Sequence, residues 1–507
     1  MGCVVQAGAL LGVDAVSVQV EVELLKRLPF MVIVGLADHA VQEASERVRS
    51  AMHFLGLDFP KMRVVVNLSP ADLPKSGTLF DLPIAVGLLA ASEHIPKGRL
   101  ESTLFIGELS LEGNLRPIRG VISLALLARA RGLPRMIVPA ANAREAAWVD
   151  GVTVHAAQSL AEVIEWARSE RELPIVTPQQ TQSAEVGDVP DLSDVRGQTR
   201  VRRALEVAAA GGHNLLMIGP PGCGKSMLAA RLPTILPALS HGEAVDVTRI
   251  HSVAGLLRNE GGLITVRPFR APHHTISRAG MIGNAALLPG EISLAHHGVL
   301  FLDELPEFGR AVLEVLRGPL EDRVIRLTRS KGTVTFPASV SVVAAANPCP
   351  CGYLGHPIKP CGCLPAGIER YRARMSGPLL DRLDLHLWVQ PVPADELASG
   401  ASGEKSQLVR ERVTKARGIQ TARYAGGPIR CNAELGSDLV KERVDVRGDA
   451  VRALQDVLER HSLSARAWAR ILKVARTIAD LEGSGPVEVP HVLEATSYRV
   501  PIMEMTQ

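Results

Sequence analysis

Residues 219–226 read Gly219-Pro220-Pro221-Gly222-Cys223-Gly224-Lys225-Ser226 and follow an apolar run, residues 214–218, that is typical of a buried strand. A strand, a glycine-rich turn and a helix in this order form the P-loop pattern. The glycines let backbone N–H groups converge on phosphates at the helix N-terminus, where the helix dipole favours negative charge. Lys225 would reach the β- and γ-phosphates, and the Ser226 hydroxyl would bind Mg²⁺. The segment predicts an ATP and Mg²⁺ site in an α/β domain.

A second apolar run, residues 299–302, ends in the two acids Asp303 and Glu304. Such a strand places its carboxylates at the carboxyl edge of a parallel sheet, beside the P-loop. Asp303 would hold Mg²⁺, directly or through water, and Glu304 would polarise the attacking water. The pair predicts hydrolysis of the bound nucleotide.

A third apolar run, residues 340–346, ends in Asn347. Its neutral amide is suited to orienting the water near the γ-phosphate. The alternative is a plain turn, because an Asn before a proline, here Pro348, favours one.

Two arginines further along the chain are candidates for contact with the nucleotide. Arg382 lies on a turn after the core, from which it could enter the ATP site of a neighbouring subunit. The alternative is an ion pair with Asp381 or Asp384. Arg466 is near the start of a late helix that could fold onto the nucleotide, and Arg470, one turn on, is the alternative.

The length of 507 residues exceeds what one hydrophobic core usually serves. We expect an α/β domain over residues 1–175, a polar linker over 176–191, the ATPase core over 192–393 and a helical lid over 394–507. With 3% aromatic residues, stacking cannot be a main binding device, and a net charge of +3 does not by itself indicate nucleic acid. No basic leader and no apolar run of bilayer length is evident, which predicts a cytoplasmic protein without membrane contact.

Four of the seven cysteines form two C-x-C pairs, which are Cys349, Cys351, Cys361 and Cys363. In a reducing compartment such a group indicates a metal rather than disulfides. Four thiolates suit a closed, structural Zn²⁺ site, although the commoner spacing is C-x-x-C. Free or redox-active thiols are the alternative.

Residues 324–328 and 333–336 read as two strands joined at the basic turn Arg329-Ser330-Lys331-Gly332. In a ring, such a hairpin would project toward the pore, where Arg326, Arg329 and Lys331 could follow a phosphate backbone without reading bases. A plain solvated hairpin is the alternative.

Together these residues resemble the magnesium-chelatase-like AAA+ family, in its ComM (YifB-type) competence group, over essentially the whole chain. The resemblance also rests on four further motifs: residues 194–198 (DVRGQ), 270–275 (RAPHHT), 347–352 (NPCPCG) and 475–480 (ARTIAD). It implies a homo-hexameric ATPase ring that translocates on single-stranded or branched DNA. Such a ring acts as a helicase in branch migration, when incoming strands integrate during natural transformation, with recombination proteins as partners.

The resemblance also assigns roles to residues. Val195 and Gln198 would flank the adenine, next to a nucleotide-binding stretch that runs from Gly219 through Met227. Asn347 would sense the γ-phosphate, Arg382 would act in trans, and Arg466 would be the lid sensor. His273 and His274 would lie in an insertion that faces the ring's channel; a turn with capped or core histidines is the alternative.

The N-terminal domain resembles the Lon-protease-type domain, with residues 74–81 (PKSGTLFD) at the position of the serine loop. Leu79 stands at the nucleophile position and Leu124 at the lysine position, and neither can attack or take a proton. The domain is therefore expected to be a non-proteolytic scaffold or a DNA-contacting ring.

Three functions are compatible with these sequence features. The first is a DNA motor, favoured by the extra N-terminal domain and the basic hairpin. The second is the ATPase subunit of a metal chelatase that inserts Mg²⁺ into a porphyrin, supported by the shared core. The third is a non-motor regulator that uses ATP only to assemble, which the complete pair of acids Asp303 and Glu304 argues against.

Overall fold

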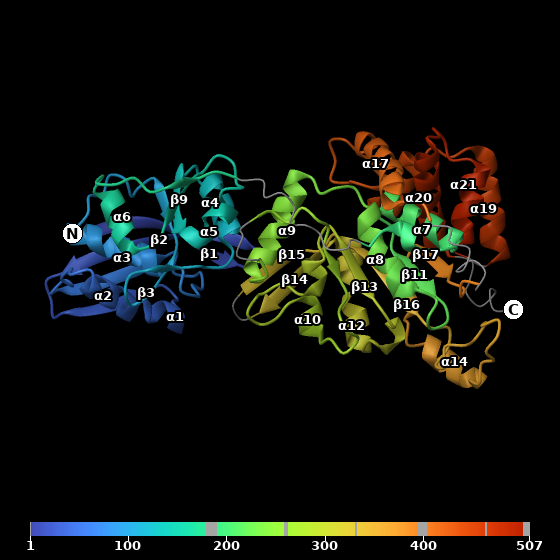
Figure 1. The fold of residues 1–507 in the computed structure, drawn as a ribbon, viewed down its shortest axis with the longest axis horizontal. Coiled ribbons are helices and arrows are strands. Elements are labelled where there is room, and N and C mark those ends of the chain that lie inside the picture. The colour runs from blue at the N-terminus through green and yellow to red at the C-terminus, as the bar shows by residue number, and fades with distance from the viewer. Residues whose placement is uncertain are drawn as a thin grey trace.

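The computed structural model describes residues 2–178, 190–257, 262–329, 332–393, 403–461 and 464–499. Three regions follow one another along its longest axis (Figure 1). An α/β domain with the N-terminus lies at one end, the P-loop core occupies the middle, and a group of helices lies at the other end. The predicted fold class is confirmed.

The N-terminal domain is built on an eight-stranded sheet with the order β10-β9-β8-β5-β1-β2-β4-β3. Helix α3 packs on β1 and β2 with every residue buried, which explains why its sequence is apolar after Asp81. The elements are β1 (Gly2–Leu11), β2 (Asp14–Leu25), β3 (Phe30–Val34), α1 (His39–Gln42), α2 (Ala44–Phe54), β4 (Arg63–Ser69), α3 (Asp81–Ala91), β5 (Thr103–Phe105), β6 (Glu108–Leu109), β7 (Leu115–Arg116), α4 (Val121–Ala130), β8 (Arg135–Pro139), α5 (Ala140–Ala146), β9 (Thr153–Ala157), α6 (Leu160–Ala167) and β10 (Ile175–Val176).

The core has a five-stranded parallel sheet with the order β12-β13-β16-β11-β17. Its three central strands are the three apolar runs predicted to carry the site, so their carboxyl ends meet at one edge. The elements are η1 (Leu192–Asp194), α7 (Thr199–Gly211), β11 (Leu215–Ile218), α8 (Lys225–Ile235), α9 (His241–Val253), β12 (Phe269–Arg270), α10 (Arg278–Ile282), α11 (Glu291–Leu294), β13 (Val299–Leu302), η2 (Leu305–Glu307), α12 (Arg310–Val315), α13 (Arg317–Asp322), β14 (Val324–Arg329), β15 (Gly332–Pro337), β16 (Ser341–Ala346), α14 (Pro365–Arg372), α15 (Gly377–Leu380) and β17 (Leu385–Trp388).

The C-terminal region is helical, and its long helix α20 packs against α7 of the core and against α17. Its elements are α17 (Ser406–Arg423), η3 (Asn432–Glu434), α18 (Ser437–Arg443), α19 (Gly448–Arg460), α20 (Ala465–Glu482) and α21 (Val489–Ser497). Among the helices of the described ranges, none combines the length and apolarity that a bilayer crossing requires.

The N-terminal domain contacts the core through α4, which packs on α9. The Gly120 N–H donates to Ser252 Oγ at 2.9 Å, and Arg249 pairs with Asp14 at 3.1 Å. The β1–β2 turn also reaches the β14–β15 hairpin, because a Cβ on Gly12 would lie 3.1 Å from the Cβ of Val334. The apolar face of the basic hairpin is therefore packed against the N-terminal domain as well as the core.

Most predicted elements match the structure within a residue or two. Residues 40–55, whose sequence predicts a single helix, instead form two, α1 and α2. Strand β10 ends at Val176, one residue past the predicted domain boundary, and residues 179–189 of the predicted linker lie outside the described ranges. The domain boundaries stay a prediction.

Candidate nucleotide-binding site

The P-loop connects β11 to α8 in the predicted way. Gly222 and Gly224 have φ values of +80° and +86°, a region that favours glycine. A Cβ on Gly219 would lie 2.2 Å from the Val389 carbonyl oxygen, so only glycine fits there. The backbone of the turn can therefore reach the N-terminus of α8 only with glycine at these three positions.

Lys225 points into the turn, where it is buried. Its Nζ donates to the carbonyl oxygens of Gly219 at 2.7 Å and Pro220 at 2.9 Å, and to Asn347 Oδ1 at 3.1 Å. Burial lowers the pKa of the Lys225 ammonium, a cost that a phosphate beside it would offset. The structure thus brings together the predicted phosphate-binding lysine and the predicted γ-phosphate sensor.

The predicted Mg²⁺ ligands also meet. Ser226 Oγ donates to Asp303 Oδ2 at 2.7 Å, and the Glu304 N–H donates to Asp303 Oδ1 at 2.9 Å. A hydroxyl on the first turn of α8 and a carboxylate after β13 are the hard oxygen ligands that Mg²⁺ takes beside substrate phosphates. The donor set therefore fits Mg²⁺ with ATP.

Glu304 lies at a left-handed backbone position, with φ of +52°, and its side chain is 53% exposed. His274 Nδ1 lies 3.4 Å from Glu304 Oε2, and the His274 ring stacks on His273 at 4.1 Å. Sequence reasoning assigned both histidines to a channel-facing insertion and missed this contact. The structure connects that insertion directly to the carboxylate that would activate water.

Arg382 is held by contacts within its own chain, but not by the partners that the sequence suggested. Its Nη2 pairs with Glu321 Oε1 at 2.5 Å, and its Nη1 donates to the Pro378 carbonyl at 2.6 Å. The expected partners are engaged elsewhere: Asp381 with Arg499 at 3.5 Å and Asp384 with Arg470 at 2.6 Å. The predicted alternative pair with Asp381 or Asp384 is therefore wrong.

Arg470 belongs to a buried charge cluster. Burial by itself raises the pKa of Asp384, but the His213 hydrogen bond and the Arg470 charge together hold that pKa well below its usual range. Arg470 thus has a structural partner, whereas Arg466 is exposed near the start of α20. Among the described contacts, none joins Arg466 to the P-loop, so its role stays a prediction.

The segment predicted to flank the adenine lies beside the P-loop helix. Asp194 pairs with Arg231 of α8 at 2.8 Å, and Val195 is buried. Gln198 has a φ of +52° and donates through Nε2 to the Gln390 carbonyl at 2.6 Å. Met227, on the first turn of α8, is 39% exposed, as a residue that covers a base would be.

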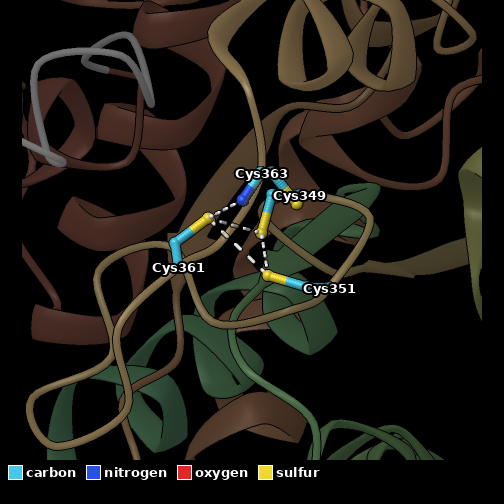
Figure 2. Close-up of side chains that lie close together, drawn as sticks. All are labelled: Cys349, Cys351, Cys361 and Cys363. Atoms are coloured by element: carbon cyan, nitrogen blue, oxygen red, sulfur yellow. Dashed lines mark hydrogen bonds between the residues drawn. The ribbon is translucent and has the colours of Figure 1, made fainter.

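The four clustered cysteines converge in the loop between β16 and α14 (Figure 2). The Cys349 and Cys351 sulfurs lie 3.4 Å apart, and each lies 3.6 Å from the Cys361 sulfur. The Cys363 sulfur completes a group in which all four sulfurs lie within 4.8 Å of one another. A disulfide needs about 2.05 Å, whereas tetrahedral Zn–S bonds of about 2.3 Å place sulfurs about 3.8 Å apart.

Backbone N–H groups turn toward the sulfurs, as they do around thiolates. Leu354 N–H donates to Cys349 Sγ, and Cys363 N–H donates to Cys361 Sγ, both at 3.4 Å. A hydrogen bond from the Tyr353 backbone lowers the pKa of Cys351 to about 6. The donor set fits a closed metal site of the type that Zn²⁺ prefers.

The predicted DNA residues Arg326 and Arg329 are exposed on the β14–β15 hairpin. One face of the hairpin is apolar and buried, and it consists of Ile325, Leu327, Val334 and Phe336. Arg326 lies on the other face, whereas Arg329 follows Leu327 on the apolar side, at the end of β14. Lys331, the third predicted residue, lies outside the described ranges. The hairpin thus carries exposed cations while its apolar side chains fix it to the rest of the structure.

Comparisons with known proteins now assign the family. The profile described as "Magnesium chelatase, subunit ChlI" matches residues 191–397, "Subunit ChlI of Mg-chelatase" matches 20–142, and "Magnesium chelatase, subunit ChlI C-terminal" matches 403–499. The competence protein ComM of Haemophilus influenzae is 43% identical over 504 residues, covering 98% of this chain and 97% of that protein. The chain belongs to the magnesium-chelatase-like ComM/YifB family. The uncharacterized protein YifB of Escherichia coli is also 43% identical, over 98% of this chain and 96% of the length of YifB.

As a ComM/YifB-type protein, the chain has the AAA+ core whose members hydrolyse ATP. Its N-terminal domain is similar to a part of Lon protease 2 of Bacillus subtilis, 27% identical over 122 residues, which are 24% of this chain and 21% of that protein. Leu79 and Leu124, at the predicted nucleophile and lysine positions, are both buried. A buried leucine offers neither a nucleophile nor a base.

Proposed function

We propose that this protein is an ATP-driven DNA motor that forms a hexameric ring and drives branch migration when incoming DNA is integrated. The observation that carries the proposal is the assembled site of Lys225, Asn347, Ser226 and Asp303, in a chain whose full-length relative is named a competence protein. Lys225 and the P-loop amides bind the phosphates, Asp303 and Ser226 hold Mg²⁺, and Glu304 activates water. Asn347 senses the γ-phosphate.

Hydrolysis in a ring uses a residue from the next subunit. In this proposal Arg382 leaves Glu321 and stabilises the transition-state charge in the neighbour's site, while Arg466 contacts the nucleotide from the lid. The 14% exposed side chain of Arg382 has to change partner when subunits meet. Assembly and hydrolysis are thereby linked.

A second candidate is the ATPase subunit of a metal chelatase, which the family descriptions favour. The two functions differ in what stimulates hydrolysis. A motor responds to DNA, whereas a chelatase subunit responds to its partner subunits and porphyrin. The exposed cations of the hairpin support the motor.

Changing Arg326 and Arg329 together to alanine is expected to weaken DNA binding and leave DNA-free ATP hydrolysis nearly unchanged. For each phosphate contact that is lost, DNA binding releases fewer counterions. The slope of log affinity against log salt should therefore become shallower by up to about one unit per contact. The loss should be similar across DNA sequences, because backbone contacts carry no base code. Fluorescence anisotropy over a salt series measures both quantities.

The matched control removes two exposed arginines from the lid, Arg443 and Arg452, at the same change in charge. It should bind DNA with wild-type affinity and slope. If the hairpin variant assembles and also binds like wild type, the hairpin is a solvated loop and the DNA path lies elsewhere, with His273 and the N-terminal domain as the next places to test.

We also propose that Cys349, Cys351, Cys361 and Cys363 bind one structural Zn²⁺. Their sulfur spacing and N–H donors support a closed tetrahedral site, which leaves no position for water activation.

Protein purified without chelators is expected to contain about one zinc per chain, since four thiolates complete its coordination. Replacing Cys349 and Cys351 with serine should release the metal and lower the thermal unfolding midpoint, because structural zinc contributes folding free energy directly. Elemental analysis and a thermal melt test this. Changing Cys431, a buried cysteine far from the cluster in sequence, to serine is the control that should keep the metal.

A further inference from the structure

The cysteine loop packs directly on the P-loop. Gly352 follows Cys351 and has a φ of +83°, and a Cβ at this position would lie 2.8 Å from Pro221 Cδ and 3.9 Å from Asn347 Cγ. The metal-binding turn therefore contacts one residue of the phosphate-binding loop and the predicted sensor at the same time. An alanine at position 352 would have to displace Pro221, while its distance to Asn347 is that of an ordinary contact.

The same loop continues the sensor strand. Asn347 directly follows β16 and is followed, after Pro348, by the buried Cys349. The Asn347 amide oxygen in turn accepts from Lys225 Nζ at 3.1 Å. The first sulfur of the cluster is thus two residues from a side chain that touches the phosphate-binding lysine.

The outer part of this loop is weakly packed. Ile358 and Leu364 are 85% and 78% exposed, whereas Tyr353 and Leu354, nearer the P-loop, are half-buried. Hydrophobic burial therefore contributes little to the position of residues 356–364. A metal that joins residues 349, 351, 361 and 363 would supply the missing constraint, since a tetrahedral thiolate site fixes the backbone on both sides of the loop.

We propose that the metal-bound cysteine turn is a positioning element of the nucleotide site, which holds Pro221 and Asn347 where the phosphates need them. The proposal rests on the zinc site proposed above and extends it: the metal touches no nucleotide, but its loss loosens the P-loop and the sensor together. ATP affinity and hydrolysis then depend on the metal, although its ligands take no part in the chemistry.

The test compares two glycines of the same loop. Gly352→Ala should retain stoichiometric zinc but lower affinity for a fluorescent ATP analogue about tenfold or more, because overpacking moves Pro221 of the P-loop. Gly355→Ala is the control: its φ of +74° imposes the same kind of strain, but its Cβ would meet the Trp388 ring at 2.9 Å instead of Pro221. Its affinity should stay within about twofold of wild type.

The second arm uses the wild-type chain. Zinc is removed with a chelator, the chelator is dialysed away, and nucleotide binding is measured in excess Mg²⁺ before and after zinc is restored. Affinity should fall on removal and return on addition, which decides the question even if Gly352→Ala does not fold. Wild-type protein that never contains zinc would contradict the zinc site itself. Protein that contains zinc but binds nucleotide equally well without it would overturn the positioning role alone.

Discussion

Lys225→Ala is expected to lower ATP affinity about 10- to 100-fold, since hydrogen bonds to charged groups contribute about 1.5–3 kcal/mol and 1.4 kcal/mol is tenfold. The reason is local, because Lys225 Nζ lies among the P-loop carbonyls and Asn347, where the phosphates would bind. Titration with a fluorescent ATP analogue measures the change. Loss of the ammonium should also remove hydrolysis, because Lys225 neutralises charge on the transferred phosphoryl group.

Glu304→Gln is the matched control at the opposite side of the site. It keeps Ser226, Asp303 and Lys225, so it should bind ATP like wild type but hydrolyse it about 10²- to 10⁴-fold more slowly, the usual contribution of a general base. Lys225→Ala should thus lose ATP affinity, whereas Glu304→Gln should lose only hydrolysis. Equal ATP affinity in Lys225→Ala and wild type would remove the P-loop assignment.

Arg382→Ala is expected to slow hydrolysis about 10³- to 10⁵-fold, as removal of an arginine finger does, with ATP binding to each subunit nearly intact. The residue is far from being a free surface side chain, because Glu321 and the Pro378 carbonyl hold it. Steady-state hydrolysis and nucleotide titration separate the two effects. Arg374→Ala, which removes an exposed arginine of the same segment that pairs with Glu307 at 3.0 Å, should hydrolyse ATP normally.

Mixing tests whether Arg382 acts in trans. Rings that combine Arg382→Ala with Lys225→Ala contain interfaces where an intact P-loop meets an intact Arg382 of the neighbour. Such mixed rings should regain part of the wild-type rate. Mixed rings that assemble, as light scattering would show, and remain inactive would place the finger elsewhere.

The convergence of the nucleotide site could be predicted from the sequence. Three apolar runs end in the P-loop, in Asp303 and in Asn347, and parallel strands bring their carboxyl ends to one edge. The Ser226–Asp303 and Lys225–Asn347 contacts are direct consequences of that rule. The cysteine spacing likewise predicted a cluster, because two C-x-C pairs joined by a turn can meet without contacts from distant segments of the chain.

Other contacts depend on how distant segments pack, and no local pattern reveals them. Glu321 lies on α13, and nothing in its neighbourhood marks it as the partner of Arg382. The contact of His274 with Glu304 requires the insertion to fold back over β13. The contact of Gly352 with Pro221 is equally invisible, because a glycine in a cysteine loop reads only as a turn.

The central claim is that hydrolysis at this site moves DNA. The measurement that tests it most directly is ATP hydrolysis and branch migration by the purified, assembled protein on a synthetic branched DNA, with Glu304→Gln as the inactive control. The account predicts that DNA stimulates hydrolysis and that the branch moves only with ATP and the wild-type chain. Hydrolysis that does not respond to DNA, together with a branch that stays in place, would contradict it.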